Sequence, residues 1–174
     1  STDCVFSGKK GLYSEVDFTD AREIYGISKS IGELHDLNTV TLRTSTIGHE
    51  MGSSDGLLEW FLKQEVACNG YRKAIFSGLP TITLAKIIRD YIIKNTSLHG
   101  LYHLSAEPID KYSLLGLIAK IYTKDIKINI DDRFIIDRSL SSQKFYNATG
   151  YNAPSWEILL EEMYNDYMQR SSNV

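Results

Sequence analysis

Tyr25 and Lys29 are the pair of residues in this sequence whose types and spacing most directly suggest chemistry. They stand four residues apart in the segment Tyr25-Gly26-Ile27-Ser28-Lys29. In a helix, both side chains would point from one face, about one turn apart. A positive charge beside a phenol favours the phenolate, which suits the tyrosine to general acid or base work. The same spacing occurs on many solvated helix surfaces, so the pair alone leaves a purely structural role open.

Two further polar segments lie where strands are expected to end. Ser1-Thr2-Asp3 offers hydroxyl groups, and Arg43-Thr44-Ser45 closes the next predicted strand. In an open parallel sheet, ligands bind beyond the carboxyl ends of the strands. We therefore expect both segments to converge with Tyr25 and Lys29 on one crevice.

A strand, a helix and a second strand are expected to position these residues. Residues 1–6 resemble a strand, and residues 39–44 are rich in β-branched side chains, which predicts another. Between them, residues 21–36 predict a helix that packs on a sheet, with Asp20 available as its N-cap. This order indicates a parallel βαβ unit and an α/β fold. The apolar positions of the helix are Ile24, Ile27, Ile31 and Leu34.

The rest of the chain predicts further alternation of helices and strands. Residues 56–64 indicate a helix that is apolar over most of its surface and must be covered by other parts of the protein. Pro80-Thr81 begins the next helix, with Thr81 as N-cap and a buried face extending to Ile92. Additional helices are predicted over residues 112–122, 139–146 and 154–167, and strands over residues 100–104 and 126–130.

Composition argues against several classes of function. The 174 residues include 19 Lys and Arg against 22 Asp and Glu, a net charge of −3 without blocks of one sign. This balance is typical of a globular domain and argues against a nucleic-acid partner. No apolar run approaches the roughly 18 residues of a membrane span, and the first residues lack the features of a signal peptide. We therefore expect a cytoplasmic protein without membrane association.

Cysteine and histidine residues give no pattern of metal ligands. Cys4 and Cys68 are too few for a disulfide framework and are predicted to be small buried side chains. His99 and His103 are four residues apart in a predicted strand, where that spacing separates side chains by about 13 Å. We therefore expect no metal site. His49 follows the second strand and either contacts substrate or is an ordinary loop histidine.

Several segments together resemble the extended short-chain dehydrogenase/reductase family, and within it the dTDP-4-dehydrorhamnose reductase-like members. The resemblance covers nearly the whole chain. The three most specific segments are residues 1–8 (STDCVFSG), 25–33 (YGISKSIGE) and 42–45 (LRTS). Further similar segments are residues 76–81 (FSGLPT), 102–104 (YHL) and 138–140 (RSL).

The resemblance implies catalytic roles for Thr2, Tyr25 and Lys29 and coenzyme contacts for residues of two segments. Thr2 would hydrogen-bond the substrate carbonyl, Tyr25 would supply its proton, and Lys29 would hold the nicotinamide ribose. Thr44 and Ser45 would lie beside the nicotinamide. The implied fold is a partial Rossmann-type parallel sheet with flanking helices and a small substrate-binding lobe. Hydride would come from NADPH or NADH.

The implied reaction is reduction of a 4-keto nucleotide sugar, in deoxysugar biosynthesis for surface polysaccharide. Asp3, Cys4, Thr46, His49 and Arg138 are the expected substrate-binding residues. The family often has Tyr at the position of Cys4 and Trp at that of Thr46, and both aromatic residues lie near the sugar in the rhamnose enzyme. Their replacement leaves the identity of the sugar open.

Other functions remain possible within the same resemblance. Nucleotide-sugar 4,6-dehydratases tend to have glutamate where this chain has Cys4, and 4-epimerases usually have a serine-rich stretch in place of Ser1-Thr2-Asp3. Both departures favour simple reduction. A regulatory protein similar to the β subunit of methionine adenosyltransferase is the alternative that is not an enzyme.

The glycine-rich dinucleotide fingerprint of the family is not found in this sequence. Residues 1–48 are therefore expected to be the C-terminal part of the NAD(P)-binding domain. Residues 49–174 would be mainly the substrate-binding lobe, with some strands returning to the Rossmann sheet. The N-terminal glycine-rich half, roughly a hundred residues, would be absent. The residues that distinguish NADPH from NADH lie in that half, so the choice of coenzyme stays open. The predicted first strand would then be an exposed edge of the parallel sheet. Such an edge favours either pairing with a second copy of the chain, in a homodimer, or a rearrangement of the edge itself.

Overall fold

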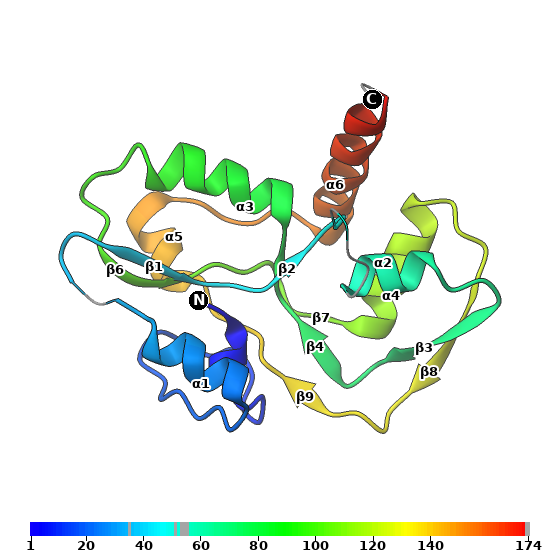
Figure 1. Ribbon diagram of the computed structural model, residues 1–174, viewed down its shortest axis with the longest axis horizontal. Coiled ribbons are helices and arrows are strands. Elements are labelled where there is room, and N and C mark those ends of the chain that lie inside the picture. The colour runs from blue at the N-terminus through cyan, green and yellow to red at the C-terminus, as the bar shows by residue number, and fades with distance from the viewer. Residues whose placement is uncertain (35, 51, 53–55, 173–174) are drawn as a thin grey trace.

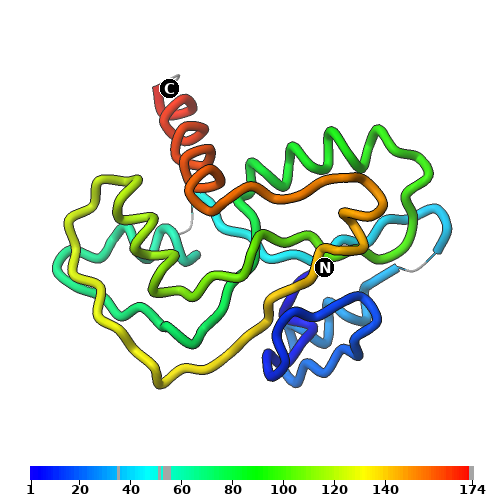
Figure 2. The backbone as a smooth tube through the Cα atoms, turned by 180° about the vertical axis from the view of Figure 1, so that it is seen from behind, coloured from blue at the N-terminus to red at the C-terminus, as the bar shows by residue number. Residues whose placement is uncertain are grey.

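The computed structural model describes residues 1–34, 36–50, 52 and 56–172 (Figure 1). Its strands form parallel pairs flanked by helices, with one antiparallel pairing. β1 (Val40–Arg43) pairs in parallel with β6 (Gly100–His103), so residues on both sides of the predicted boundary near residue 48 lie in one sheet. In Figures 1 and 2, α3 (Thr81–Ile87) and α5 (Gln143–Thr149) lie on one side of this pair and α1 (Ile24–Ile31) lies on the other.

The first residues form a turn, and the predicted strand over residues 1–6 is wrong. Only Thr2 makes a parallel bridge, to Thr44, and the chain then turns through a 3₁₀ helix, η1 (Asp3–Val5). The Thr2 side chain accepts a hydrogen bond from the Cys4 N–H, and the Phe6 N–H bonds to the Asp3 carbonyl. These local bonds close the turn that replaces a longer strand.

Helix α1 is shorter than predicted, and Asp20 is not its N-cap. The carboxylate of Asp20 instead accepts bonds from the N–H and hydroxyl of Ser7, and Glu23 is the capping residue. The expected burial of the apolar positions is also wrong, since Ile24 and Ile31 are 87% and 81% exposed. Gly26 is the residue of α1 that is buried, because η1 packs against it.

The middle of the chain adds a short strand pair and a long helical segment. β2 (Thr46–Ile47) pairs in parallel with β5 (Leu79–Pro80), and α3 follows at once. Pro80, not the predicted Thr81, is the capping residue, without a side-chain hydrogen bond. The helix continues as a π-helical turn (η2, Ile88–Ile92).

A lobe of helices and short strands occupies the other end of the molecule (Figure 1). α2 (Leu57–Leu62) and α4 (Lys111–Ile121) confirm the predicted helices, and β8 (Lys127–Asp131) confirms the predicted strand. β8 pairs in parallel with β3 (Ala67–Tyr71). A three-stranded sheet places β4 (Ala74–Phe76) between β7 (Ile109–Asp110) and β9 (Ile136–Asp137).

From β9 the chain leaves the lobe and returns to the N-terminal segment (Figure 2). The Asp137 N–H bonds to the Gly8 carbonyl, and Tyr13 makes a parallel bridge with Leu140. α5 then ends at Gly150 in the left-handed conformation, with φ +73°. The last helix is α6 (Trp156–Ser171). No helix among the described residues is both long and apolar enough to cross a bilayer.

The main hydrophobic core joins the lobe to the β1–β6 pair. Cys68 lies in it, as predicted, whereas Cys4 is only half-buried, because it faces a cavity at the other end of the fold. Among the side chains that it buries almost completely are Leu58, Phe61, Leu104, Leu114, Leu115, Ile118, Phe145, Leu159 and Leu160.

We expect Gly26→Ala to destabilise the protein by about 1 to 3 kcal/mol, because an added Cβ would lie 2.2 Å from the Cys4 carbonyl oxygen. Gly116→Ala is the matched control, since its Cβ would meet nothing within 4 Å in the exposed face of α4. It should stabilise by about 0.5 to 1 kcal/mol. Urea unfolding measures both, and equal effects of the two substitutions would contradict the close packing of α1 on η1.

Candidate active site

A cavity of about 500 Å³ lies where the N-terminal turn, α1 and the end of β1 meet. The predicted catalytic residues Thr2 and Tyr25 line it, together with Thr44 and Ser45. The parallel bridge between Thr2 and Thr44 brings two of these segments together. The cavity thus brings together Thr2, Tyr25, Thr44 and Ser45, whereas Lys29 and Arg43 are not among its lining residues. The remaining lining residues are Ser1, Cys4, Leu42, Thr46, Leu84 and Ile88.

Lys29 lies one turn along α1 from Tyr25, as the spacing predicts. Its ammonium nitrogen is 5.9 Å from the centre of the Tyr25 ring. Lys29 borders a second hollow, of about 550 Å³, which shares Ser1 and Leu42 with the first cavity. The phenol and the ammonium group thus stand over adjoining hollows, both accessible to a ligand.

Thr2 is buried and fixed by its neighbours in the turn. Its hydroxyl donates to the Asp3 carboxylate at 3.1 Å and accepts from the Cys4 N–H at 3.2 Å. Burial raises the pKa of Asp3 above its usual range, although the bonds from Thr2 and Cys4 oppose this rise. A buried acid at this position costs stability at neutral pH, a pattern common at functional sites.

A buried ion pair lies behind the cavity and was not predicted from the sequence. Arg43 makes a bidentate contact with Glu33, with Nε at 2.7 Å from Oε1 and Nη2 at 2.6 Å from Oε2. Ser1 Oγ donates to the same Glu33 Oε1 at 2.6 Å, and the main-chain nitrogen of Ser1 donates to the Leu42 carbonyl. Glu33 lies one residue beyond Gly32, the C-cap of α1, while Arg43 precedes Thr44 and Ser1 precedes Thr2. One ion pair therefore ties together all three site segments.

His103 extends this network into the interior. Arg43 Nη1 lies 3.3 Å from His103 Nε2, and His103 Nδ1 lies 3.0 Å from the Tyr13 carbonyl. Because a guanidinium only donates, Nε2 must accept and Nδ1 must carry the proton. Burial lowers the pKa of His103, which agrees with a neutral ring.

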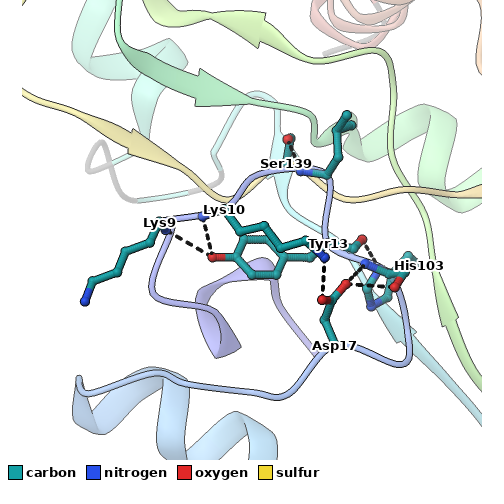
Figure 3. A network of polar contacts seen from close by, with 8 residues as sticks. Lys9, Lys10, Tyr13, Asp17, His103 and Ser139 are labelled. Carbon is teal, nitrogen blue, oxygen red and sulfur yellow. Dashed lines mark hydrogen bonds and ion pairs between the residues drawn. The ribbon is translucent and has the colours of Figure 1, made fainter.

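The loop after the N-terminal turn is fixed by Tyr13 (Figure 3). Its hydroxyl accepts from the N–H groups of Lys9 and Lys10, at 3.0 and 3.1 Å. Its ring stacks on Phe6 at 4.1 Å, and the Arg43 guanidinium lies 5.2 Å from the centre of the Phe6 ring. Because Phe6 is the C-cap of η1, this stack supports the turn that carries Thr2.

The predicted substrate-binding residues do not all lie together. Cys4 and Thr46 line the cavity, and Asp3 lies behind Thr2. Arg138 is close by, with Nη1 3.5 Å from Cys4 Sγ. His49 is not among the residues that line the cavity. It contacts the lobe residues Glu59, Tyr122 and Tyr167, the first two by hydrogen bonds of 2.8 and 2.9 Å and the third by stacking at 3.7 Å.

Comparison with known proteins relates this arrangement to a defined fold. No family model and no curated protein sequence matches the chain. A solved structure of dTDP-4-dehydrorhamnose reductase from Bacillus anthracis, in complex with NADP, superposes with a TM-score of 0.79 at 23% identity, over 95% of this chain and 63% of that one. The reductase from Yersinia enterocolitica gives 0.76 at 20% identity, over 94% and 63%. The chain has the fold of these reductases. It spans about 63% of their length.

The same fold is shared by enzymes with other reactions. A dTDP-glucose 4,6-dehydratase from Bacillus anthracis, in complex with NAD, gives a TM-score of 0.71 at 16% identity, over 99% of this chain and 61% of that one. The predicted α/β fold is thus confirmed.

We expect Glu33→Gln to destabilise the fold by about 3 to 5 kcal/mol, because the amide leaves the Arg43 guanidinium buried without a counter-charge. Asp90→Asn is the control, since Asp90 forms its ion pairs with Arg89 and Lys94 on the surface and should change stability little. Denaturant unfolding compares the two, and a similar small effect for both would show that the buried pair does not hold the segments together.

Asp3 should make the protein less stable as the pH rises. Its pKa is raised in the folded state, so folded protein binds this proton more tightly than unfolded protein. The free energy of unfolding therefore falls as the pH rises from the ordinary value of 3.8 through the folded-state pKa. Asp3→Asn should be more stable than the unaltered chain at pH 7, with the difference vanishing below pH 3.8. Thermal melts across this range test it, and an unchanged pH profile would contradict the raised pKa.

Proposed function

We propose that this chain carries the catalytic and substrate-binding residues of an NAD(P)H-dependent reductase acting on a 4-keto nucleotide sugar. The observation that carries the proposal is the placement of the Thr2 and Tyr25 side chains on one cavity, with the Lys29 ammonium beside the tyrosine ring. A purely structural role does not require this combination. The likeness of the fold to dTDP-4-dehydrorhamnose reductases supports the class of substrate. The product would be a nucleotide-linked deoxysugar for surface polysaccharide.

Each residue has a defined part in the reduction of a carbonyl group. The Thr2 hydroxyl turns its single proton from Asp3 to the substrate carbonyl oxygen and so positions and polarises it. Tyr25 donates its phenolic proton to that oxygen as the carbon receives hydride, which converts the ketone into an alcohol. Lys29 stabilises the phenolate that remains, and solvent restores its proton.

The residues of this chain fit one end of a nicotinamide coenzyme, which would supply the hydride when bound. Tyr25 and Lys29 offer a hydroxyl and an ammonium donor for ribose oxygens, and the Thr44 and Ser45 hydroxyls line the same cavity. A glycine-rich loop for the phosphates does not occur in this sequence. The match therefore concerns the nicotinamide riboside end alone.

Cys4 favours reduction over dehydration. The dehydratases that this chain resembles tend to have glutamate at this position, where the acid works on the elimination. Burial and the neighbouring Asp3 raise the pKa of the Cys4 thiol, so it stays protonated at neutral pH. A neutral thiol does not exchange protons as a carboxylate does, and no carboxylate is among the described residues that line the cavity.

Tyr25→Phe in the full-length protein should lower kcat at least about a hundredfold, because the proton donor is lost. Coenzyme binding, followed by nucleotide fluorescence, should be retained. Tyr146→Phe is the control, because Tyr146 is an exposed tyrosine on α5 away from this cavity. Turnover of a 4-keto nucleotide sugar that persists in Tyr25→Phe would refute the mechanism.

A further inference from the structure

His103 is a buried histidine at the end of β6 that has no part in the proposed reaction. Its side chain is fully enclosed, and it stands opposite Arg43 in the register of the β1–β6 pair. A titratable ring that is removed from water needs a hydrogen-bond partner for each nitrogen. The partners of His103 belong to a loop and a strand that lie behind the cavity of Thr2 and Tyr25.

The two ring nitrogens of His103 face opposite demands. Nδ1 lies 3.0 Å from the Tyr13 carbonyl oxygen, which only accepts (Figure 3). Nε2 lies 3.3 Å from Arg43 Nη1, which only donates. Both contacts are hydrogen bonds only when the ring is neutral and carries its proton on Nδ1. A proton on Nε2 would point at a guanidinium N–H, and the enclosed ring has no water to turn to.

The charged groups around this ring come from several elements. Burial lowers the pKa of the ring and is the largest influence on it. Arg43 on β1 lowers it too, whereas Glu15, in the loop between η1 and α1, and Glu33, beyond α1, raise it. Both carboxylates accept other hydrogen bonds: Glu15 Oε1 accepts from the main-chain N–H of the histidine at 2.7 Å, and Glu33 accepts from Arg43. Lys144 of α5 lies on the opposite face of β6, over the Tyr102 ring.

Arg43 connects the ring to the site. Its Nε and Nη2 bind Glu33, and the same carboxylate accepts Ser1 Oγ at 2.6 Å. Nη1 is the remaining nitrogen, so the contact with the imidazole fixes the third side of the guanidinium. Thr44 follows Arg43 directly and bridges in parallel with Thr2. A shift of the guanidinium therefore reaches two residues that line the cavity.

We propose that His103 is a positioning residue of the reductase site, whose neutral ring, protonated at Nδ1, orients Arg43 and thereby fixes Thr2 and Thr44 at the cavity. For its effect on turnover, this inference rests on the proposed function. A ring protonated at Nε2 would place a donor against a donor, and the guanidinium would lose its third point of attachment. The tautomer of one histidine is thus a condition for the geometry of the site.

NMR of the 174-residue chain tests the tautomer. Long-range correlation of ring nitrogens with ring protons should show, at pH 7, a proton on Nδ1 of His103 and none on Nε2. The signals are assigned by their loss in His103→Gln. A ring that carries its proton on Nε2, or on both nitrogens, would overturn the inference.

Stability of the same chain gives a second readout. Because the folded-state pKa of His103 is lowered, unfolded protein takes up this proton at a higher pH than folded protein does. As the pH falls from the ordinary value of 6.5 through the folded-state pKa, the unaltered chain should lose stability relative to His103→Gln. Denaturant unfolding across this range measures the difference, and parallel profiles would contradict a ring that is held neutral.

Turnover of the full-length protein tests the consequence for the site. His103→Gln should keep most of kcat at pH 7, because its amide offers an acceptor to Arg43 and a donor to Tyr13. His103→Leu removes both and should lower kcat about ten- to a hundredfold, more than it changes KM. His99→Leu is the matched control, an exposed histidine four residues earlier whose ring bonds to the Ser97 carbonyl, and it should turn over normally. Circular dichroism checks that each variant is folded.

Two kinetic outcomes would overturn the positioning role: a folded His103→Leu with unchanged kcat, or a His103→Gln that loses as much as His103→Leu. Where His103→Leu does not fold, the tautomer and the His103→Gln comparison decide. If the proposed reduction is wrong, the full-length protein will not turn over a 4-keto nucleotide sugar, while the tautomer and the stability profile stay as expected. If the positioning role alone is wrong, Tyr25→Phe will still lose turnover and His103→Leu will not.

Discussion

The buried contact between Glu33 and Arg43 is the constraint on which the rest of the site depends. Its two hydrogen bonds join the end of α1 to the end of β1, and Ser1 adds a third bond to the same carboxylate. Glu33 lies just beyond the helix that carries Tyr25 and Lys29, and Arg43 directly precedes Thr44. A buried charge pair is a poor source of net stability compared with apolar packing, but it accepts little variation in geometry. Its benefit here is that three segments, distant in sequence, are held in one relative position.

The network continues from this pair into apolar packing. Arg43 touches the Phe6 ring and bonds to His103, and Phe6 stacks on Tyr13. Tyr13 in turn bridges to Leu140, next to the segment that supplies Arg138. The Glu33–Arg43 pair behind the cavity is thus linked, through the stack of Phe6 on Tyr13, to the segment that carries Arg138. The site and the smaller hydrophobic cluster form one unit, so packing changes at Phe6 or Tyr13 would be felt at Thr2.

One fold with several reactions is a general property of such α/β enzymes, and local chemistry separates them. In this chain the relevant positions are small or polar: Cys4 is a protonated thiol, and Thr46 leaves space where a larger ring would fill the cavity.

The sequence by itself determined the helices of the lobe, the strands β1, β6 and β8, and the pairing of Tyr25 with Lys29, because periodicity and spacing along one element are local properties. It did not determine the turn at Asp3–Val5, since the bond from Cys4 to Thr2 outweighs the strand-like composition there. It also misplaced the apolar face of α1, where η1 covers Gly26 and leaves Ile24 and Ile31 exposed. The loop position of His49 left a contact with substrate open, and only the fold shows that His49 bonds to Glu59 and Tyr122. The partners of Arg43 were decided by tertiary structure alone, because the burial and pairing of a charge depend on elements that meet only when the chain is folded.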